Sequence, residues 1–465
     1  MEHIKKELET ILQEPISNDD SNVFEPALQS LNHETLLESA RRFGTPQYLL
    51  DQDALTTRAL FFAETMRRYL PRSEFFYAFK CNDLPFLINA LKETGFHADV
   101  AGMFELQLAL RLGFERIVFN GPGKSVEELK LSVKEKDRVI VNIDNFDELL
   151  RLRAIAEEEQ VTVNVGLRLN SDSLTQGEWS KFGFELDEVR RAVEQIGETP
   201  YLEWAGLHFH CSWNKTPQKY LDNIAYIATY LKRHFSENQL KQLRFFDIGG
   251  GFYPESQAII NKIQDKGILL DTLGARCGNK KDIYARSGFD PYGFSVIPVE
   301  PLETFAHAIS TAINEHIRSL NPDIDIYVEP GRFIATFATS MLLGVTAVKK
   351  NCVIVDGGIH MLGDYKFSEY SFAPIVNMTR PSTRMRRTLI YGPLCDPNDL
   401  WGYSYYGDDI QKGDILAVLY QGAYTFSTAW RFIKANPRYI AVSKNRFVIA
   451  KEAETFNDRY GNCNF

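Results

Sequence analysis

The sequence predicts an α/β protein made of a (β/α)8 barrel of the TIM type and a second, mainly β domain. From about residue 75, short runs rich in β-branched and aromatic residues alternate with amphipathic helical stretches. This alternation continues for about 250 residues, which is the usual size of such a barrel. After about residue 331, strand-like runs and turn signals continue while long helices become few, which favours a β domain.

Eight runs are expected to form the barrel strands. They cover residues 74–80, 97–101, 116–121, 139–143, 163–170, 204–210, 244–250 and 325–331. Strands that alternate with helices form parallel βαβ units, and eight such units predict a closed barrel.

The stretches between these runs carry signals for helix ends. Ser125 with Glu128 forms a capping box, in which each side chain accepts a hydrogen bond from the other residue's main-chain N–H. Asn145 with Glu148 resembles a second helix start. Gly95 stands where a residue in the left-handed conformation ends a helix. These signals place helices between the strands, as a barrel requires.

The expected domain boundaries follow the change of pattern. Residues 1–30 are a polar leader, helical at first and then loose; residues 55–331 form the barrel; residues 31–54 and 332–465 form the β domain, which the strand-like run 45–51 joins. Residues 252–324 are long for a barrel connection and are expected to hold an insertion.

Composition disfavours several classes of function. The net charge of −9 over 465 residues argues against nonspecific binding to nucleic acid or to an anionic membrane. No apolar run reaches the about 18 residues of a membrane span, and the first residues lack the apolar stretch of a secretory signal. Six cysteines are scattered without a CxxC pair, which is typical of reduced thiols. We therefore expect a cytoplasmic protein without a metal.

Chemically competent residues occur where the predicted strands end, and active sites of such barrels lie at the carboxyl ends of the strands. These residues are Lys80, Asp99, Arg168, His210, Gly249, Gly250, Gly251, Glu329 and Arg332. A lysine amine can form a Schiff base with an aldehyde cofactor, and a carboxylate such as Glu329 can pair with a protonated pyridine nitrogen. Successive glycines let main-chain N–H groups approach a phosphate, which Arg332 can bind as a charged fork. An imidazole at His210 can stack on an aromatic ring, so the set predicts pyridoxal 5′-phosphate.

Six motifs occur in an order that resembles one known family. They are YAFKCN (77–82), HFH (208–210), DIGGGF (247–252), EPGR (329–332), GPLCDPND (392–399) and GAYTF (422–426). The chain resembles the fold-type III decarboxylases, the ornithine/diaminopimelate/arginine decarboxylase family, from about residue 45 to 435. The resemblance implies a barrel and a β domain in the arrangement of alanine racemase, and decarboxylation of an amino acid to an amine and CO₂.

The resemblance also implies roles for individual residues. Lys80 matches the cofactor-binding lysine, His210 the ring-stacking histidine, Glu329 the partner of the pyridine nitrogen, and Gly249, Gly250, Gly251, Arg332 and Tyr424 the phosphate site. Cys395 and Asp396 match residues that reach into a neighbouring subunit's site, which implies a homodimer with shared active sites; the cysteine helps to protonate the carbanion and the aspartate contacts substrate. Asp99 is expected to help keep the ring polarised, and Arg168 to contact the cofactor.

Two departures from the family pattern affect the phosphate and the substrate. The family commonly follows the stacking histidine with a Gly-Ser pair that helps to hold the phosphate, whereas this chain has Cys-Ser-Trp. We therefore expect this phosphate contact to be shifted or replaced, with Ser212 as a candidate substitute. Diaminopimelate decarboxylases usually carry an arginine where this chain has Asp364, and a glutamate where it has Asp396. Together with Asp356, these acids favour a substrate with a cationic far end.

Several alternatives remain open. Asp99 and Arg168 could instead be ion-pair members of the barrel core. A racemase on the same fold would lack the GPxCD motif and normally use a tyrosine as its second base, and a non-catalytic regulatory relative would typically lose the lysine or the phosphate residues. His208 and His210 lie i,i+2 and could bind a metal, but the sequence offers no further ligand. Ornithine, lysine, diaminopimelate, diaminobutyrate, and a carboxylated siderophore or polyamine intermediate all remain possible substrates, with D or L configuration.

Overall fold

The chain forms two compact units. The computed structural model describes residues 6, 10, 11, 24–171, 180–254, 257–261, 265–278, 280–287, 289–363 and 372–464. Residues 52–255 and 299–336 form one unit, called here the barrel unit, and residues 1–51, 256–298 and 337–465 form the other, called the sheet unit. Among the described residues, no helix combines the length and apolar character needed to cross a bilayer.

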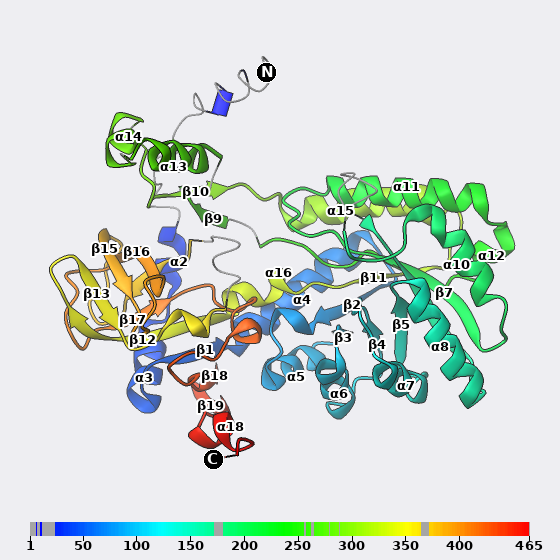
Figure 1. Ribbon diagram of the computed structural model, residues 1–465, viewed down its shortest axis with the longest axis horizontal. Helices are drawn as coiled ribbons and strands as arrows, with labels where there is room; N and C mark the ends of the chain where they lie inside the picture. The colour runs from blue at the N-terminus through cyan, green and yellow to red at the C-terminus, as the bar shows by residue number, and fades with distance from the viewer. Residues whose placement is uncertain are drawn as a thin grey trace. The chain divides into compact units, whose positions relative to one another are not determined.

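The barrel unit contains a closed barrel of eight parallel strands, which confirms the predicted fold class (Figure 1). In order around the barrel they are β11 (Asp325–Val328), β2 (Ser73–Ala78), β3 (His97–Val100), β4 (Ile117–Phe119), β5 (Val139–Ile143), β6 (Val163–Leu169), β7 (Leu202–Phe209) and β8 (Phe245–Asp247). All eight observed strands lie in or overlap the predicted runs.

Helices of the barrel unit lie around the outside of these strands (Figure 1). They are α4 (Gln52–Tyr69), α5 (Pro85–Glu93), α6 (Met103–Arg111), α7 (Val126–Lys134), α8 (Phe146–Glu159), α10 (Val189–Ile196), α11 (Gln218–His234), α12 (Glu237–Lys241), α15 (Leu302–Ala312) and α16 (Arg332–Ala335). The capping box of Ser125 and Glu128 begins α7, and the Asn145 side chain accepts a hydrogen bond from the Glu148 N–H at the start of α8. Local sequence therefore sets where these helices begin.

An apolar cluster fills the barrel interior beneath the strand ends. Phe76, Phe245 and Tyr327 are its large members, and the rings of Phe245 and Tyr327 stack with their centroids 4.7 Å apart. Tyr327 precedes Glu329 by two residues. Because alternate residues of a strand point to the same face, the barrel interior changes from apolar to polar towards the carboxyl ends of its strands.

The sheet unit contains a nine-stranded, mixed sheet. In spatial order its strands are β13 (Cys352–Val355), β15 (Met385–Tyr391), β16 (Leu400–Tyr406), β14 (Ile375–Asn377), β17 (Ile415–Val418), β12 (Thr339–Val348), β1 (Gln47–Asp51), β18 (Tyr439–Ser443) and β19 (Arg446–Lys451). β1 pairs antiparallel with β12 and parallel with β18, so the run 45–51 does join the mainly β unit, as expected.

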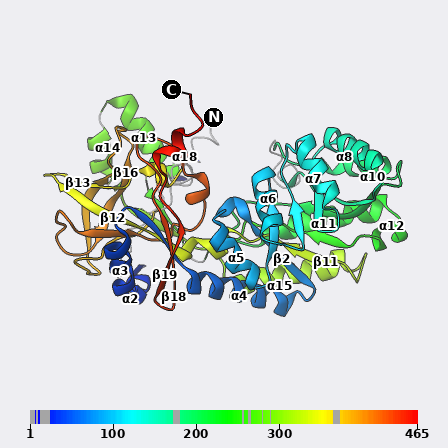
Figure 2. The same cartoon turned by 90° about the horizontal axis from the view of Figure 1, so that it is seen from below.

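Two helices near the start of the chain pack on this sheet (Figure 2). They are α2 (Glu25–Ser30) and α3 (His33–Phe43). Residues 25–30 were expected to belong to a loose leader, which is wrong, because Phe24 and Leu28 lie in the apolar core of the sheet unit. Residues four apart share one face of a helix, and this pair makes α2 amphipathic. The rest of the leader lies largely outside the described residues.

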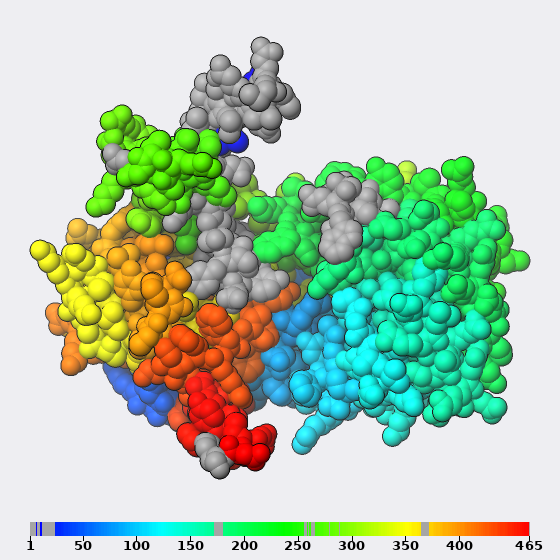
Figure 3. Space-filling view, viewed as in Figure 1, coloured from blue at the N-terminus to red at the C-terminus, as the bar shows by residue number. Residues whose placement is uncertain are grey.

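The expected insertion in residues 252–324 belongs to the sheet unit over residues 256–298. It contains β9 (Gln257–Ile260) and β10 (Phe294–Ile297), which pair antiparallel, and the helices α13 (Asp265–Cys277) and α14 (Lys280–Ser287). Figure 3 shows α13 and α14 in green at the surface. Phe294 stacks on Phe372 with ring centroids 4.3 Å apart, so aromatic packing attaches the insertion to the sheet, although its chain neighbours lie in the barrel unit. A short helix, α18 (Phe456–Tyr460), follows β19.

Candidate active site

The predicted residues of the barrel unit are brought together at the carboxyl ends of the strands. Lys80 lies in a single 3-10 turn directly after β2, and Asp99 lies at the end of β3. The Lys80 Nζ is 2.7 Å from Asp99 Oδ2. The lysine side chain is 35% exposed while that of Asp99 is fully buried, so the amine faces accessible space and its partner does not.

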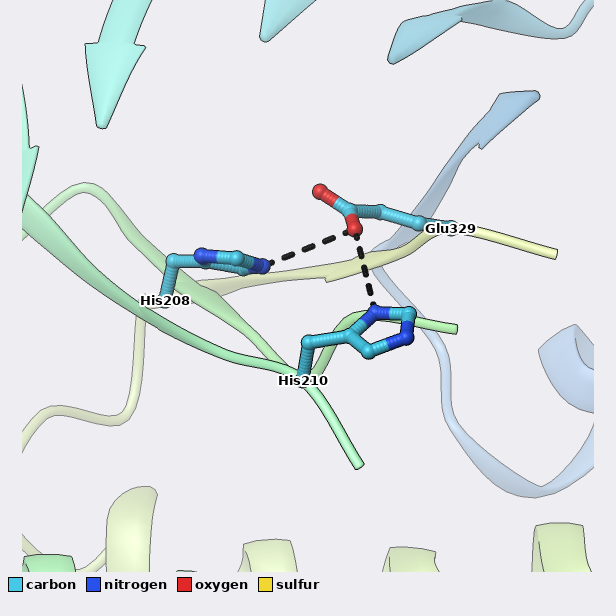
Figure 4. A group of neighbouring side chains, drawn as sticks. All are labelled: His208, His210 and Glu329. Atoms are coloured by element: carbon cyan, nitrogen blue, oxygen red, sulfur yellow. Dashed lines mark ion pairs between the residues drawn. The ribbon is translucent and has the colours of Figure 1, made fainter. Parts of the chain in front are cut away.

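Glu329 follows β11 and faces two histidines, His208 of β7 and His210 directly after that strand (Figure 4). Its Oε2 lies 3.5 Å from His208 Nε2 and 3.9 Å from His210 Nδ1. Burial lowers the pKa of His208 to about 4 although Glu329 opposes the shift. Burial acts to raise the pKa of Glu329, but His208, His210 and Lys80 outweigh it and hold the pKa well below its ordinary value. At neutral pH the site therefore contains an ionised Glu329 beside a neutral His208.

Two further buried carboxyl groups respond to the charge on Glu329. Burial and Glu329 together raise the pKa of Asp99, against the attraction of Lys80. The same two causes, in the same order, raise the pKa of Asp247 well above its ordinary value. Asp247 Oδ1 accepts the Gly249 N–H at 2.9 Å. Like charges in a dry site destabilise one another, so the ionised Glu329 raises the pKa of its neighbouring carboxyl groups.

Asn120 connects these carboxyl groups and was not predicted. Its Nδ2 donates to Asp99 Oδ1 at 2.8 Å and to Glu329 Oε1 at 2.5 Å. Its Oδ1 accepts from Asn142 Nδ2 at 2.6 Å. Asn120 follows β4 directly and Asn142 lies in β5, so the strand-end rule that identified Lys80 would have found Asn120 had it been applied to amides.

Arg168 is buried among the polar groups around Asn120. Its Nη1 donates to the Asn120 main-chain oxygen at 2.6 Å, and its Cζ is 4.3 Å from the centroid of the Phe182 ring. Burial lowers its pKa, against the attraction of nearby carboxylates. Among the described residues its Nε has no hydrogen-bond partner. These contacts fit the alternative role as a polar member of the barrel interior, and contact with a cofactor stays a prediction.

The three glycines after β8 form a turn that allows close approach of another chain segment. Gly249 and Gly251 have φ of 68° and 92°, a conformation that other residues rarely adopt. A Cβ added to Gly250 or Gly251 would lie 2.2 Å from the Glu329 oxygen or 1.9 Å from the Cys211 oxygen of the main chain. We call this turn the glycine cradle.

His210 is attached to the glycine cradle. Its Nδ1 accepts the Gly250 N–H at 3.1 Å, so this nitrogen carries no proton and its 3.9 Å contact with Glu329 is not a hydrogen bond. Burial lowers the pKa of His210, which keeps the ring neutral. The hydrogen bond fixes one edge of the imidazole and leaves its face available for stacking.

His208, His210 and Glu329 also meet the geometric requirement for a metal site, since their ligand atoms lie within 4.8 Å of one another. The sequence offered no third ligand beside the two histidines, and the fold provides one in Glu329. The lone pair of His210 Nδ1 already accepts a hydrogen bond, which disfavours coordination. The arrangement is better explained by an organic cofactor.

The remaining predicted residues lie elsewhere. Ser212 is exposed and follows β7 in the barrel unit, whereas Cys395, Asp396, Tyr424 and Asp356 belong to the sheet unit. Both carboxylate oxygens of Asp356 are engaged within that unit, by the Thr45 hydroxyl at 2.6 Å and the Gly344 N–H at 2.8 Å. Asp364 lies outside the described residues.

The loop that carries Cys395 is held by an aspartate that was not predicted. Asp399 is buried, and its carboxylate accepts from the Leu394 N–H at 2.7 Å and the Ile359 N–H at 2.8 Å. Cys395 is exposed and Asp396 is half-buried on this loop. The signal in the sequence was the last residue of GPLCDPND, an acid four residues after Cys395.

The barrel site fits pyridoxal 5′-phosphate. A partly exposed amine, an ionised buried carboxylate and a glycine cradle correspond to the aldehyde, the pyridine nitrogen and the phosphate of that cofactor. Among the described residues both ring nitrogens of the buried His208 lack a hydrogen-bond partner, since 3.5 Å is at the outer limit for such a bond. Fold and site thus define a pyridoxal-phosphate enzyme of the barrel type.

Comparison with known proteins identifies the family. Residues 62–288 match the pyridoxal-binding domain of the pyridoxal-dependent decarboxylases, and residues 333–422 match their C-terminal sheet domain. The chain belongs to the ornithine/diaminopimelate/arginine decarboxylase family of fold-type III enzymes. It is therefore a pyridoxal-phosphate-dependent amino-acid decarboxylase, and the racemase and non-catalytic interpretations are set aside.

Individual relatives cover nearly the whole chain. A diaminopimelate decarboxylase of Archaeoglobus fulgidus is 26% identical over 437 residues, covering 90% of this chain and 93% of the relative. An L-glutamyl-[BtrI acyl-carrier protein] decarboxylase of Niallia circulans is 24% identical, covering 89% and 92%. The crystal structure of diaminopimelate decarboxylase from M. jannaschii in complex with L-lysine has a TM-score of 0.75 at 22% identity, covering 91% and 92%, which supports the fold.

Proposed function

We propose that this decarboxylase acts on an amino acid that carries a second amino group. The relatives support this substrate class: several are named diaminopimelate decarboxylase, and a solved lysine/ornithine decarboxylase from Vibrio vulnificus contains putrescine. In this chain the half-buried Asp396 offers a carboxylate for a distant ammonium group. Asp356 is a weaker candidate than its sequence position suggested, because both of its oxygens are engaged.

The observation that supports Lys80 as the cofactor-binding residue is its amine at 2.7 Å from a buried carboxylate whose pKa is raised. In this proposal Lys80 is the residue that would hold the cofactor by its aldehyde. An ammonium is not a nucleophile, so Lys80 Nζ must first lose a proton. Asp99 Oδ2 is within hydrogen-bond distance of that proton, and a carboxylate with a raised pKa is the better acceptor for it.

The other residues bind and orient. Bound pyridoxal phosphate supplies an electron sink for the electrons that remain when CO₂ leaves. Glu329 keeps a negative charge where the pyridine nitrogen is expected, and His210 stacks against the ring. The glycine cradle and Arg332 bind the phosphate, with Ser212 as a further candidate. Tyr424, which the sequence also assigned to the phosphate, belongs to the sheet unit, and its role stays a prediction.

We propose a homodimer in which each site is completed by Cys395 and Asp396 of the partner. Cys395 is a free, exposed thiol on a loop fixed by Asp399, which suits a group that must deliver a proton to the substrate carbon. Oligomers with a two-fold axis present the same surface twice, so two complete sites result. The six described cysteines are all free, which supports a cytoplasmic location.

The roles can be tested with two variants. The purified protein should show the visible absorbance band of the lysine-bound cofactor, and Lys80→Ala should abolish both the band and CO₂ release. Cys395→Ala should keep the band and lose amine formation. If sites are shared, mixing Lys80→Ala with Cys395→Ala restores up to about a quarter of native activity through mixed dimers. A band that survives in Lys80→Ala would refute the lysine assignment, and mixing without recovery would refute sharing.

The substrate class needs a separate assay. CO₂ release should be measured with lysine, ornithine, diaminopimelate and diaminobutyrate, each in both configurations, and with norleucine as an isosteric substrate that lacks the second amine. Faster turnover of norleucine than of every diamino acid would contradict the proposal without affecting the cofactor roles.

A further inference from the structure

The guanidinium of Arg332 lies against two aromatic rings. Its Cζ is 5.6 Å from the centroid of the Trp213 ring and 5.2 Å from that of the Tyr253 ring. The two ring centroids are themselves 5.8 Å apart, with an interplanar angle of 34°. The three groups therefore form a triangle, which we call the aromatic clamp, with the cation resting on a pair of rings.

The aromatic clamp borders the glycine cradle. Arg332 is the first residue of α16, and Tyr253 follows Gly251 by two residues. On the other side, the Asn214 N–H beside Trp213 donates to the Gly251 oxygen at 3.2 Å. All three members of the clamp thus come from segments that touch or continue the turn expected to bind the phosphate.

The backbone of Trp213 is strained. Its φ is 64°, in the left-handed region, which is costly for a bulky side chain. The side chain is 46% exposed, so burial in the core does not explain why the conformation is retained. The ring contacts with Arg332 and Tyr253 offer an explanation, because a strained residue persists where its surroundings stabilise it.

Trp213 also stands in the segment in which the chain departs from its family. Where the Gly-Ser pair is expected after the stacking histidine, the sequence reads Cys211-Ser212-Trp213. A tryptophan has no hydroxyl, and its one donor is the indole N–H at the edge of the ring. It can act on the phosphate through a cation, since an arginine over an aromatic face is attracted to it and keeps its planar fork of N–H groups for an oxyanion.

We propose that Trp213 and Tyr253 are positioning residues that hold Arg332 as the phosphate fork and so replace the phosphate contact of the missing Gly-Ser pair. This inference rests on the proposed role of Arg332 in binding the phosphate. It predicts that the rings contribute to the affinity for the phosphate and not to the affinity for the rest of the cofactor.

The test compares two aldehydes. The full-length chain, freed of cofactor, is titrated with pyridoxal 5′-phosphate and with pyridoxal, which lacks the phosphate, and the absorbance of the lysine-bound form gives each Kd. Glycine adopts a φ of 64° without strain, so Trp213→Gly removes the ring without disturbing the backbone. We expect a Kd for pyridoxal phosphate that is about threefold to tenfold higher, from the usual strength of a cation–π contact, and an unchanged Kd for pyridoxal.

Conservative variants provide the rescue. Trp213→Phe and Tyr253→Phe keep an aromatic face and should bind pyridoxal phosphate nearly as the native chain does. If Trp213→Gly raises the Kd values of both aldehydes equally, the role of the ring is merely structural. If it changes neither Kd, the ring does not contribute to cofactor binding. Either result overturns the inference.

A variant of the arginine separates this inference from the proposal on which it rests. Arg332→Ala should lose the preference for pyridoxal phosphate over pyridoxal, and Trp213→Gly should then add no further loss in the double variant. If Arg332→Ala keeps the preference, the phosphate role of Arg332 is wrong and the positioning role falls with it. If Arg332→Ala loses the preference while Trp213→Gly retains it, only the role of the rings is wrong.

Discussion

Replacing Asn120 by alanine removes the amide that donates hydrogen bonds to both Asp99 and Glu329. All three side chains are buried, so water cannot easily take the place of the lost donor. Asn142 loses its acceptor at the same time. The change therefore leaves two carboxyl groups and one amide with an unsatisfied bond in the barrel interior.

The expected cost follows from these contacts. A buried hydrogen-bonding group left without its partner costs about 1–3 kcal/mol, and more when the group is charged. Asp99 keeps Lys80 and Glu329 keeps its contact with His208, which offsets part of the loss. We expect the free energy of unfolding to fall by about 3 kcal/mol, and the pKa of Asp99 to rise further because the bond to Asn120 now lowers it.

Urea denaturation of the native chain and of Asn120→Ala at neutral pH measures this difference. Asn89→Ala is the matched control, because Asn89 makes the same kind of bond, to Glu93 at 3.0 Å, on the exposed surface. The control should change the free energy of unfolding by no more than about 0.5 kcal/mol. If Asn120→Ala proved as stable as Asn89→Ala, the hydrogen bonds of Asn120 would not stabilise the barrel interior.

Three other outcomes follow from single contacts. The pKa of His208 is lowered from its ordinary value to about 4, so between pH 6.5 and 4 the unfolded chain binds a proton that the folded chain does not, and stability falls as the pH drops. Denaturation curves at the two pH values should show that His208→Gln removes about 3 kcal/mol of this loss. An unchanged pH dependence in His208→Gln would contradict the lowered pKa of His208. Lys124 Nζ is fully buried and 2.8 Å from Glu148 Oε1. Lys124→Met leaves the Glu148 charge without its partner, so it should lower the free energy of unfolding by about 3–5 kcal/mol, and adding Glu148→Leu should recover part of that loss. A double variant no more stable than Lys124→Met would argue against a buried charge as the cause. Asp396→Asn, alone and with Asp364→Asn, should raise KM for a diamino acid about tenfold while leaving norleucine unaffected, and equal KM values with the native enzyme would remove these acids from the substrate site.

Local sequence located the chemistry of this protein because parallel strands end at one edge of a barrel. Lys80, Asp99 and Glu329 each lie at or directly after a strand that its β-branched and aromatic residues reveal. The helix starts at Ser125 and Asn145 were predictable for a similar reason, since capping depends on residues three apart in the chain.

Contacts between segments distant in sequence were not predictable in this way. The bond from Asn120 to Glu329 joins residues 209 positions apart, and the pair of Lys124 and Glu148 joins the loop before α7 to helix α8. The same limit applies to residues 256–298, which pack on the sheet unit although both of their chain neighbours belong to the barrel unit. A sequence pattern shows that a segment is amphipathic, but not which apolar surface it meets.

The sequence by itself determined the fold class, the cofactor and the residues that present an amine, a carboxylate and a glycine turn, because each depends on local periodicity or on side-chain chemistry. Only the tertiary structure decided which of those groups touch, and therefore which carboxyl group is ionised, which histidine nitrogen accepts a hydrogen bond and what lies against Arg332. The physical reason is that charge and hydrogen bonding in a buried site depend on distances of a few ångströms between strands, and the folding of the whole barrel sets those distances.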